Sequence, residues 1–502
     1  MKGVNCQNKG AVSKVSFICL QLYVTAVKKL ATTPGQQFPS SPNNASKSGS
    51  VPMTSDTQFP VPVTARPSGP LSGAARVPGD KSISHRALIF GGVAVGTTTV
   101  SGLLEGEDVL RTAAAMRQFG ANVERGENGV WRITGCGVGA LREPDEVLDM
   151  GNSGTAARLL MGLVASAPFT TFFMGDASLH KRPMGRVRVP LEEMGAKIIS
   201  RSGGRFPLAI TGQSLIPIDY ELPVASAQVK SAILLAALDT PGITRVREGK
   251  RTRDHTENML RHFGAEITVT ENADGGRSIA YRGQQELTAA DIIVPGDPSS
   301  AAFLAVAATI LPGSDVTLSN IGLNPLRDGL FITLREMGAN IEILNLREQA
   351  GERVGDLRIR ASTLHGIEVP PERAPSMIDE YPVLFIAAAF AKGRTTMRGL
   401  HELRVKESDR LSAMAAGLKA CGVAFEELED GLIIDADGTP PKGGGVIETH
   451  LDHRIAMSFL ILGLATQTPV TIDDGRVMET SFPGFVEMIN ALGATVTRGR
   501  GA

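Results

Sequence analysis

The sequence is poor in aromatic residues and has no excess of charge of either sign. Phe, Tyr and Trp make up 5% of the chain, and 51 basic side chains stand beside 52 acidic ones. A nucleic-acid-binding protein usually shows a basic excess, and a single-strand binder usually shows aromatic stacking platforms. We therefore expect no nucleic-acid partner, and any recognition of anions has to be local.

Cysteine is also scarce, and the four copies are scattered along the chain: Cys6, Cys19, Cys136 and Cys421. No CxxC pair and no histidine cluster at zinc-ligand spacing accompanies them, so the pattern supports neither a disulfide framework nor structural zinc. No apolar run is long enough to span a bilayer, because Gly, Pro or charged residues interrupt each one. We predict a soluble protein with no membrane partner, located in the cytoplasm.

The chain has 502 residues, 42% of them hydrophobic, which is more than one hydrophobic core usually serves. At least two domains are expected. Residues 1–70 differ from the rest, because they are rich in Ser, Pro, Asn and Thr, and their first acidic residue is Asp56. They fit a signal-like segment, an organellar transit peptide, or a true translation start at Met53. We favour the third interpretation and predict that residues 1–70 are a disordered extension or reflect a misassigned start; the transit-peptide alternative keeps a plastid location open.

One element recurs through the body of the chain: an apolar helix that ends in Gly and is followed by a short strand. Its six copies lie at intervals of roughly 70–85 residues and end at Gly120, Gly195, Gly264, Gly338, Gly422 and Gly493. Glycine there suits a helix C-cap in the left-handed region. A Thr/Val-rich strand precedes each copy and a hairpin signal follows most of them, so the unit is strand, loop, helix, Gly, hairpin, helix. The sequence predicts six such units, three in each of two domains.

Two similar turns divide these units into two groups of three. V-P-G-D-K-S begins at Val77 and V-P-G-D-P-S-S begins at Val294, and each opens an apolar helix. We interpret the turns as the two crossings between domains. The predicted domains are residues 81–295, and residues 71–80 together with residues 296–502, with the active site in the cleft between them.

Basic residues gather in the loops between the strand and the helix of three units, at residues 176–186, 248–257 and 403–411. A concave site built from these loops would suit a substrate with phosphate or carboxylate groups. A simpler alternative is an exposed ion-paired helix face, since Lys406, Glu407 and Arg410 have helical spacing.

Helix starts form a second set of candidate anion sites. Small or amide residues open apolar helices in G-N-S-G-T-A-A-R (151–158), A-S-A-Q-V-K-S (225–231) and L-D-H-R-I-A-M (451–457). One acidic counterpart, I-D-E-Y-P, places Asp379 and Glu380 at the mouth of another apolar helix. Asp379 can serve there as a general base or as a helix cap, and the two roles are compatible.

From residue 71 to 498 the chain resembles the 5-enolpyruvylshikimate-3-phosphate synthase family. The motifs that carry the resemblance occur in order: P-G-D-K-S-I-S-H-R, G-N-S-G-T-A-A-R, K-R-P-M, A-S-A-Q-V-K-S, T-R-D-H-T-E, I-D-E-Y-P, R-V-K-E-S-D-R-L and L-D-H-R-I-A-M. Their wording is most similar to the bacterial class II branch. The resemblance implies a two-lobed α/β fold of six βαβαββ-type units, three per domain, known as an inside-out α/β barrel.

The implied reaction transfers the enolpyruvyl group of phosphoenolpyruvate to the 5-hydroxyl of shikimate-3-phosphate. It releases phosphate through a tetrahedral intermediate, in the pathway to chorismate and the aromatic amino acids. No metal and no other cofactor is implied, and we expect a monomer. Because two anions are joined, neutralising their charge is much of the catalytic problem.

The resemblance also implies roles for individual residues. Asp379 is similar to the base that takes the hydroxyl proton, Glu407 to the group that protonates the methylene carbon, and Lys81 to a cationic stabiliser between the substrates. The residues implied on the phosphoenolpyruvate side are Lys81, Gly154, Arg182, Gln228, Arg410 and Arg454. Those implied on the shikimate-3-phosphate side are Lys81, Ser82, Arg86, Ser226, Ala227, Gln228, Arg253, Asp379 and Lys406.

Two positions depart from patterns known in the family. Thr480 stands where many members carry a lysine that contacts phosphoenolpyruvate, so that contact is missing or supplied by another residue. Gly154 stands where herbicide-insensitive class II enzymes carry Ala, and the missing methyl leaves room for glyphosate. We therefore expect glyphosate to inhibit in competition with phosphoenolpyruvate.

Two alternatives remain at this point. UDP-N-acetylglucosamine enolpyruvyl transferase shares the fold, but it would be expected to carry a reactive cysteine in a mobile loop and to lack K-R-P-M. Cys136 lies in the hairpin I-T-G-C-G-V, which is a poor match to such a loop. The second alternative is a non-catalytic protein that binds phosphorylated metabolites, and it would not need the carboxylates of Asp379 and Glu407.

Overall fold

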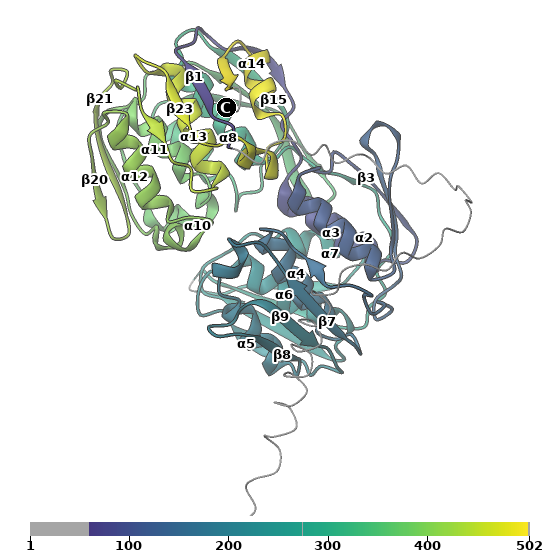
Figure 1. Ribbon diagram of the computed structural model, residues 1–502. Coiled ribbons are helices and arrows are strands. Elements are labelled where there is room, and N and C mark those ends of the chain that lie inside the picture. The colour runs from purple at the N-terminus through teal and green to yellow at the C-terminus, as the bar shows by residue number, and fades with distance from the viewer. Residues whose placement is uncertain (1–59, 274, 500–502) are drawn as a thin grey trace, which may run out of the picture. The chain divides into compact units, whose positions relative to one another are not determined.

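The described strands form six four-stranded sheets, in agreement with the six predicted units (Figure 1). The structure is a computed structural model and describes residues 60–273 and 275–499. In every sheet one pair of strands is parallel and the other two pairs are antiparallel. In five sheets two consecutive strands form a hairpin beside the strand that precedes the unit's helix. In the sixth sheet the first and last described strands of the chain pair in place of the hairpin.

Three sheets belong to the stretch between the two V-P-G-D turns. Their strands are β3 (Thr97–Ser101), β4 (Asn122–Arg125), β5 (Trp131–Thr134) and β14 (Ile292–Ile293); β6 (Leu148–Asp149), β7 (Thr170–Met174), β8 (Lys197–Arg201) and β9 (Arg205–Thr211); and β10 (Asp219–Glu221), β11 (Ile243–Glu248), β12 (Ile267–Glu271) and β13 (Arg277–Arg282). The helices of this stretch are α2 (Lys81–Val93), α3 (Glu107–Gln118), α4 (Gly154–Val164), α5 (Gly185–Glu193), α6 (Ala227–Ala236) and α7 (His255–His262).

The other three sheets combine the N-terminal strands with the C-terminal part of the chain. Their strands are β2 (Ser72–Ala75), β15 (Asp315–Gly322), β16 (Asn340–Gln349) and β17 (Glu352–Arg360); β18 (Glu368–Val369), β19 (Lys392–Met397), β20 (Phe425–Leu428) and β21 (Gly431–Asp437); and β1 (Val63–Arg66), β22 (Val446–Ile447), β23 (Val470–Ile472) and β24 (Thr495–Arg498). The helices here are α8 (Pro298–Ile310), α9 (Gly329–Glu336), α10 (Ala374–Met377), α11 (Tyr381–Ala389), α12 (Arg410–Ala420), α13 (His453–Ala465) and α14 (Phe485–Ala491).

Short 3-10 helices complete the described chain: η1 (Glu127–Gly129), η2 (Leu179–Lys181), η3 (Ala237–Asp239), η4 (Pro371–Arg373), η5 (His401–Val405) and η6 (Arg476–Thr480). The six glycines that end the repeated helices all have positive φ, between 76° and 116°. This is the left-handed conformation expected of a glycine C-cap, and it confirms the helix ends predicted from the repeat.

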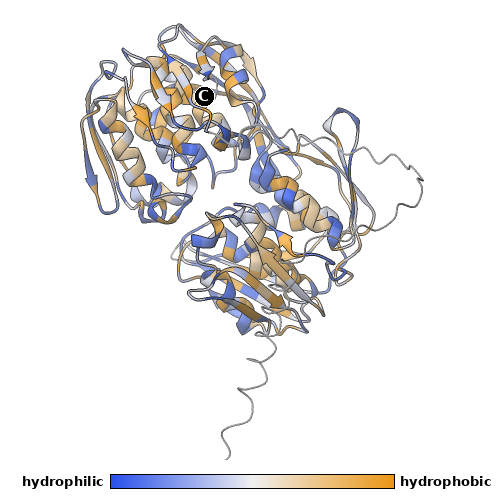
Figure 2. Cartoon of the chain, viewed as in Figure 1, coloured by the Kyte–Doolittle hydropathy of each residue, from blue (hydrophilic) through white to orange (hydrophobic). Residues whose placement is uncertain are grey.

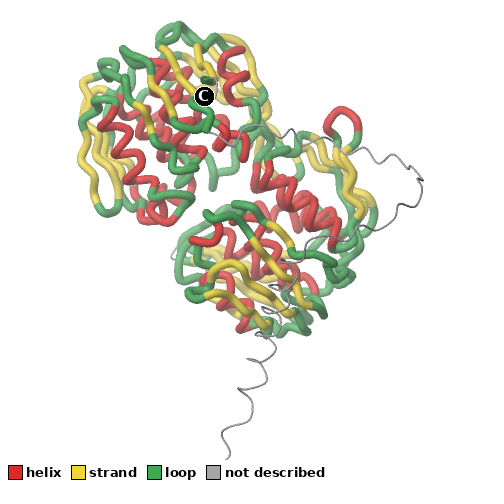
Figure 3. Tube along the Cα trace, in the orientation of Figure 1, coloured by secondary structure: helices red, strands yellow, loops and turns green. Residues whose placement is uncertain are grey.

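The inner helices of each group are apolar on all sides, because sheets and other helices cover them. All nine residues of α11 are buried, as are all but one of the residues of α8, and both helices contact α13. Figure 2 shows these helices rich in hydrophobic residues, and Figure 3 shows strands outside them. The predicted α/β fold of repeated units is confirmed, with helices inside and sheets outside; the described strands do not close a barrel.

One boundary of the sequence prediction is wrong. The prediction places residues 1–70 in a disordered extension or before the true start, yet β1 lies between β23 and β24, with Val63 opposite both Ile472 and Arg498. Val63 and Ala65 are fully buried. The N-terminal strand therefore pairs in the last sheet where the other sheets have a hairpin strand. The part of that prediction that concerns residues 1–59 lies outside the described residues.

Two separate hydrophobic cores follow the two groups of sheets. One core takes buried residues from 83 to 294, and the other takes residues 63–77 together with residues from 301 to 496. Among the described residues, no helix is both long enough and apolar enough to cross a membrane.

The two V-P-G-D turns pair with each other. The backbone N–H of Asp80 donates to Pro295 O at 2.7 Å, and the N–H of Asp297 donates to Pro78 O at 2.9 Å. Gly79 and Gly296 form an antiparallel bridge between these bonds. The repeated turn is thus one structural element made from two distant parts of the chain, and helices α2 and α8 both begin there.

Candidate active site

Six inner helices begin at motifs or turns identified in the sequence: α2, α4, α6, α8, α11 and α13. Side chains cap most of them. Asp80 and Asp297 accept from backbone N–H groups at the starts of α2 and α8, both at 2.8 Å. Ser153 and Ser226 cap α4 and α6, and Asp452 caps α13. Helix α11 is the exception, because Glu380 occupies its N-cap position and makes no side-chain cap bond, so the interpretation of Asp379 as a helix cap is wrong. The N-terminal ends of these helices supply a positive local field.

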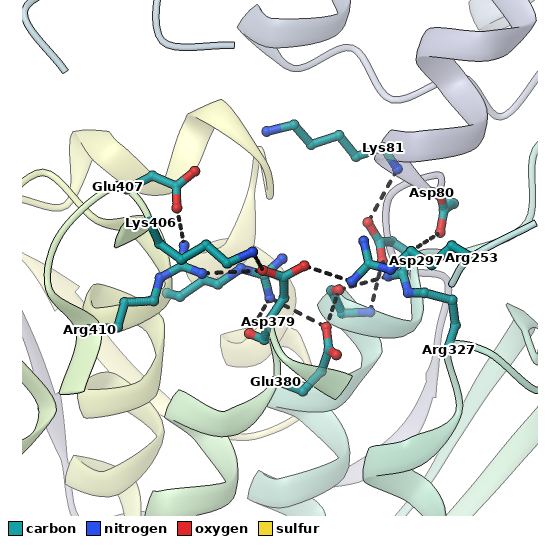
Figure 4. Close-up of polar contacts among 12 residues, drawn as sticks. Asp80, Lys81, Arg253, Asp297, Arg327, Asp379, Glu380, Lys406, Glu407 and Arg410 are labelled. Atoms are coloured by element: carbon teal, nitrogen blue, oxygen red, sulfur yellow. Dashed lines mark hydrogen bonds and ion pairs between the residues drawn. The ribbon is translucent and has the colours of Figure 1, made fainter. Parts of the chain in front are cut away.

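Asp379 is the centre of a cluster of cations (Figure 4). Its Oδ2 lies 2.7 Å from Arg253 Nη2, and its Oδ1 lies 3.3 Å from both Lys406 Nζ and Arg410 Nη1. Arg253 precedes α7, whereas Lys406 and Arg410 lie at the start of α12. Basic loops far apart in the sequence thus meet at one carboxylate.

The cations determine the charge of Asp379. Burial by itself would raise its pKa, but Lys406, Arg454, Arg253 and Arg410 outweigh burial and hold the pKa well below the ordinary value of 3.8. Arg454 also donates from Nη1 to the backbone oxygen of Asp379 at 2.7 Å. Asp379 is therefore an ionised carboxylate at neutral pH.

Glu407 lies beside this cluster and joins two further guanidinium groups. Its Oε2 is 2.6 Å from Arg410 Nη2, and its Oε1 is 3.4 Å from Arg182 Nη1. Burial would raise the pKa of Glu407, but Arg410, Arg182 and Lys406 together hold it well below its usual range. Glu407 is also ionised at neutral pH in the free protein.

Arg410 is the most deeply buried cation of the cluster, with 1% of its side chain exposed. Its Nε donates to Asp452 Oδ2 at 2.8 Å, so the cap residue of α13 fixes the guanidinium of α12. The α-helix α12 begins only at Arg410, and the segment before it is 3-10 helix and loop. The alternative that Lys406, Glu407 and Arg410 form an exposed helix face is therefore wrong.

Lys81 approaches the cluster from the start of α2. Its side chain extends toward the side on which Glu407 lies (Figure 4), and its ammonium group forms an ion pair with Asp108 of α3. Its backbone N–H donates to Asp297 Oδ2 at 3.2 Å. The two V-P-G-D turns therefore position the backbone of Lys81 jointly.

A second group of polar residues surrounds Gly154. Arg182 donates from Nη1 to Asn152 O at 3.1 Å, and Arg158 donates from Nη1 to Gln228 Oε1 at 2.8 Å. A Cβ placed on Gly154 would lie 2.8 Å from Arg158 Nη1 and 3.1 Å from Arg182 Nη1. The absence of a side chain at Gly154 thus lets two guanidinium groups approach its backbone closely.

Arg86 and its neighbours on the predicted shikimate-3-phosphate side are placed differently. Arg86 is buried and donates to Thr256 Oγ1, Ser231 Oγ and Ser82 O, at 2.8, 2.7 and 2.9 Å. Burial, only partly offset by nearby acids such as Glu257, lowers its pKa to about 10. Ser226 and Ala227 lie at the start of α6. The binding roles of these residues stay predictions.

Thr480 lies at the end of η6, where its hydroxyl donates to Val477 O at 2.8 Å. Its own backbone oxygen lies close to Gly106, since a Cβ on Gly106 would approach it to 2.7 Å. The residue that replaces the family's lysine therefore bonds within its own turn.

Sequence reasoning missed several members of the cluster. Arg158 and Asp452 lie in motifs of the sequence analysis that suggest no role for them, and Asp108 lies outside those motifs. Arg327 follows β15 in N-P-L-R-D-G, which matches none of the quoted motifs. Its 3% exposed side chain, buried among carboxylates, is a signal that only the folded chain gives.

The described cysteines are not activated. Cys421 is buried, and Cys136 donates its S–H to Gly92 O at 3.3 Å, while burial raises the pKa of both thiols. Within residues 60–273 and 275–499, no group of three His, Cys, Asp or Glu side chains is arranged to hold a metal ion.

Comparison with known proteins agrees with this site. The model of the family "EPSP synthase (3-phosphoshikimate 1-carboxyvinyltransferase)" matches residues 65–489. The 3-phosphoshikimate 1-carboxyvinyltransferase of Paramagnetospirillum magneticum is 61% identical over 437 residues, which cover 87% of this chain and 98% of that protein. The enzyme of the same name from Granulibacter bethesdensis is 62% identical over 421 residues, covering 83% and 92%. A solved structure of EPSP synthase from Acinetobacter baumannii matches with a TM-score of 0.79 and 46% identity, covering 88% of this chain and all of that one. With its repeated fold, its cationic cluster and these relatives, the chain belongs to the EPSP synthase family.

Proposed function

We propose that this protein transfers the enolpyruvyl group of phosphoenolpyruvate to the 5-hydroxyl of shikimate-3-phosphate and releases phosphate. The observation that carries the proposal is the cluster around Asp379, in which one ionised carboxylate lies among Arg253, Lys406, Arg410 and Arg454. Such a cluster can neutralise two anionic substrates and still keep a base beside them. A protein that only binds phosphorylated metabolites would not need that base.

In this mechanism the phosphoenolpyruvate phosphate and carboxylate are held by Arg182, Arg410 and Arg454, with Lys81, Gln228 and the space at Gly154 beside them. Planar guanidinium groups suit both anions, because they donate two parallel hydrogen bonds. Shikimate-3-phosphate is held by Lys81, Ser82, Arg86, Ser226, Ala227, Gln228, Arg253, Asp379 and Lys406.

The proton transfers depend on a change of charge when substrates bind. Asp379 and Glu407 have depressed pKa values because cations surround them. When the substrate anions take these cations as partners, both carboxylates lose part of that stabilisation and their pKa values rise. Asp379 then becomes a stronger base for the 5-hydroxyl proton, and Glu407 can hold the proton that it delivers to the methylene carbon.

The test is phosphate release by the full chain from shikimate-3-phosphate and phosphoenolpyruvate, compared with Asp379→Asn. Loss of a general base should lower kcat by roughly 10²–10⁴-fold. Asp315→Asn is the matched control, because Asp315 forms a half-exposed ion pair with Arg358, and the activity of this variant should equal wild type. Unchanged turnover in Asp379→Asn would show that the base is misassigned. Phosphate release with UDP-N-acetylglucosamine, and none with shikimate-3-phosphate, would favour the related transferase instead.

Glyphosate is proposed as an inhibitor that competes with phosphoenolpyruvate at the space beside Gly154. A methyl group there would press on Arg158 and Arg182. Both contacts are with the ends of flexible side chains, so the guanidinium groups would move, and Gly154→Ala should raise the glyphosate inhibition constant by roughly tenfold, or about 1.4 kcal/mol of lost binding. Gly185→Ala is the control, because a Cβ on Gly185 meets nothing within 4 Å. Equal inhibition of the wild type and of both variants would remove Gly154 from the inhibitor site.

Three further proposals concern the organisation of the protein. We propose the domains 81–295 and 71–80 plus 296–502, supported by the two hydrophobic cores, with the strand at Val63–Arg66 added to the second. We also propose a monomer in the cytoplasm. Sedimentation velocity and fractionation of the native source test the last two.

A further inference from the structure

Arg327 lies between the two V-P-G-D turns, and no role in the proposed reaction has been assigned to it. Its Nη1 is 3.3 Å from Asp80 Oδ2, and its Nη2 is 3.2 Å from Asp297 Oδ1 and 2.9 Å from Ser299 Oγ. Only 3% of its side chain is exposed. One guanidinium group therefore joins the cap residues of α2 and α8, which start on opposite crossings of the chain.

Two short paths lead from Arg327 to the active-site cluster (Figure 4). On one side, the Asp297 carboxylate that it binds also accepts the backbone N–H of Lys81, at 3.2 Å. On the other side, Ser299 donates to Glu380 Oε1. Glu380 Oε1 is in turn 3.5 Å from Arg454 Nη1, the same nitrogen that donates to Asp379 O.

The loss of Arg327 would destabilise the ionised forms of the two carboxylates that it contacts. Asp80 and Asp297 are both buried, and each lies within reach of the other's field. The other charged or titratable groups that act on the two carboxylates or on Arg327 are His85, Arg253, His255, Asp379, Glu380 and Arg454, with Lys81 beginning the helix that Asp80 caps. Of the cations, only Arg327 contacts both carboxylates directly. Two buried carboxylates without a shared cation cannot both stay ionised at low cost.

We propose that Arg327 is a positioning residue, whose guanidinium holds the two crossing turns together and thereby sets the place of Lys81 relative to Asp379 and Arg454. The proposal rests on the proposed function for its kinetic part only. A guanidinium suits this position better than an ammonium, because its two nitrogens reach two carboxylates at once.

The first test compares kcat and KM of wild type, Arg327→Met and Arg327→Lys across pH. A displacement of the reacting groups by about 1 Å can cost roughly 100-fold, so Arg327→Met should lower kcat by roughly 10–100-fold, with a smaller change in either KM. The kcat of Arg327→Lys, whose ammonium group can bind one carboxylate at a time, should lie between those of wild type and Arg327→Met. Arg358→Met is the matched control, because Arg358 forms a two-bond pair with Asp315 far from the turns.

The pH dependence separates positioning by charge from a merely structural defect. In Arg327→Met the Asp80–Asp297 pair shares a proton at low pH, and raising the pH ionises both carboxylates and pushes the turns apart. Its kcat should therefore fall further as the pH rises through the neutral and alkaline range, while wild type and Arg358→Met show no such loss. Adding Asp297→Asn removes one charge and should abolish this alkaline loss.

A readout that does not depend on turnover accompanies the kinetics. The unfolding temperature of Arg327→Met should also fall as the pH rises through that window, because the pair's pKa in the folded state is then above its unfolded value. An alkaline loss that persists in the double variant, or Arg327→Met and Arg327→Lys profiles that match wild type, would overturn the proposal. Should wild type release no phosphate, the proposed function fails, while the unfolding measurement still decides the role of Arg327.

Discussion

At the residue scale, His453 shows how the site controls charge. Burial, opposed by Asp452 and reinforced by Arg454 and Lys81, lowers the pKa of His453 to about 3. As the pH falls, the imidazole therefore begins to bind a proton in the unfolded chain while it is still neutral in the folded protein. A neutral ring adds no further repulsion to a site that already gathers several cations.

This neutrality has a consequence for stability. Below the unfolded pKa of 6.5, the unfolded chain binds a proton that the folded protein does not bind, so stability falls as the pH falls. Between pH 7 and pH 5, His453 should account for a loss of about 1–2 kcal/mol in the free energy of unfolding. Urea titrations at both pH values measure the loss, which His453→Gln should reduce by that amount. The exposed His401 gives the control, and a His401→Gln variant that changes the loss equally would contradict the assignment.

At the scale of elements, β1 has an effect on stability that its length does not suggest. This four-residue strand lies between β23 and β24, so both of its edges are paired. Val63→Ala removes apolar atoms from a fully buried position and should lower the free energy of unfolding by about 2 kcal/mol. Arg66→Ala on the exposed end of the same strand should change it by no more than about 0.5 kcal/mol. Equal effects in chemical denaturation would mean that β1 is not part of the cooperative fold.

The repeated helices could be predicted from the sequence because their signals are local. A glycine C-cap such as Gly120 or Gly493 depends on the few residues around it, and its left-handed conformation follows from steric contacts within one turn. The motifs at helix starts are equally local. The α/β class, the six units and most of the charged cluster follow from such signals.

β1 could not be predicted in the same way, because its pairing partners lie about 400 residues away and nothing in four residues marks them. The burial of Arg410 has a similar cause, since Asp452, the carboxylate that fixes it, belongs to another helix. The position of Arg327 depends on Asp80 and Asp297 together, and the sequence separates those two residues by more than 200 positions. Long-range pairing of this kind is visible only in the folded chain.

At the scale of the whole molecule, the near-neutral net charge conceals a strong local separation. The formal charge is −1, yet Arg253 from the stretch between the two turns and Lys406, Arg410 and Arg454 from the C-terminal stretch meet at Asp379. Their repulsion is offset by Asp379, Glu407 and Asp452 rather than by solvent. Substrate anions that bind there can therefore replace the protein carboxylates as partners of these cations, and no uncompensated charge has to be created first.

The two crossing turns differ in the bonds that they make at the helix starts. In each turn an aspartate caps a helix, and the next residue is the first residue of that helix. In the first turn that residue is Lys81, whose N–H donates to Asp297 of the other turn. In the second turn it is Pro298, which has no N–H, so Asp80 receives no equivalent backbone bond, although Arg327 binds both aspartates. The two nearly identical turns therefore contribute different groups: the first gives a cation, Lys81, at the start of α2, and the second gives the carboxylate that holds the backbone of that lysine.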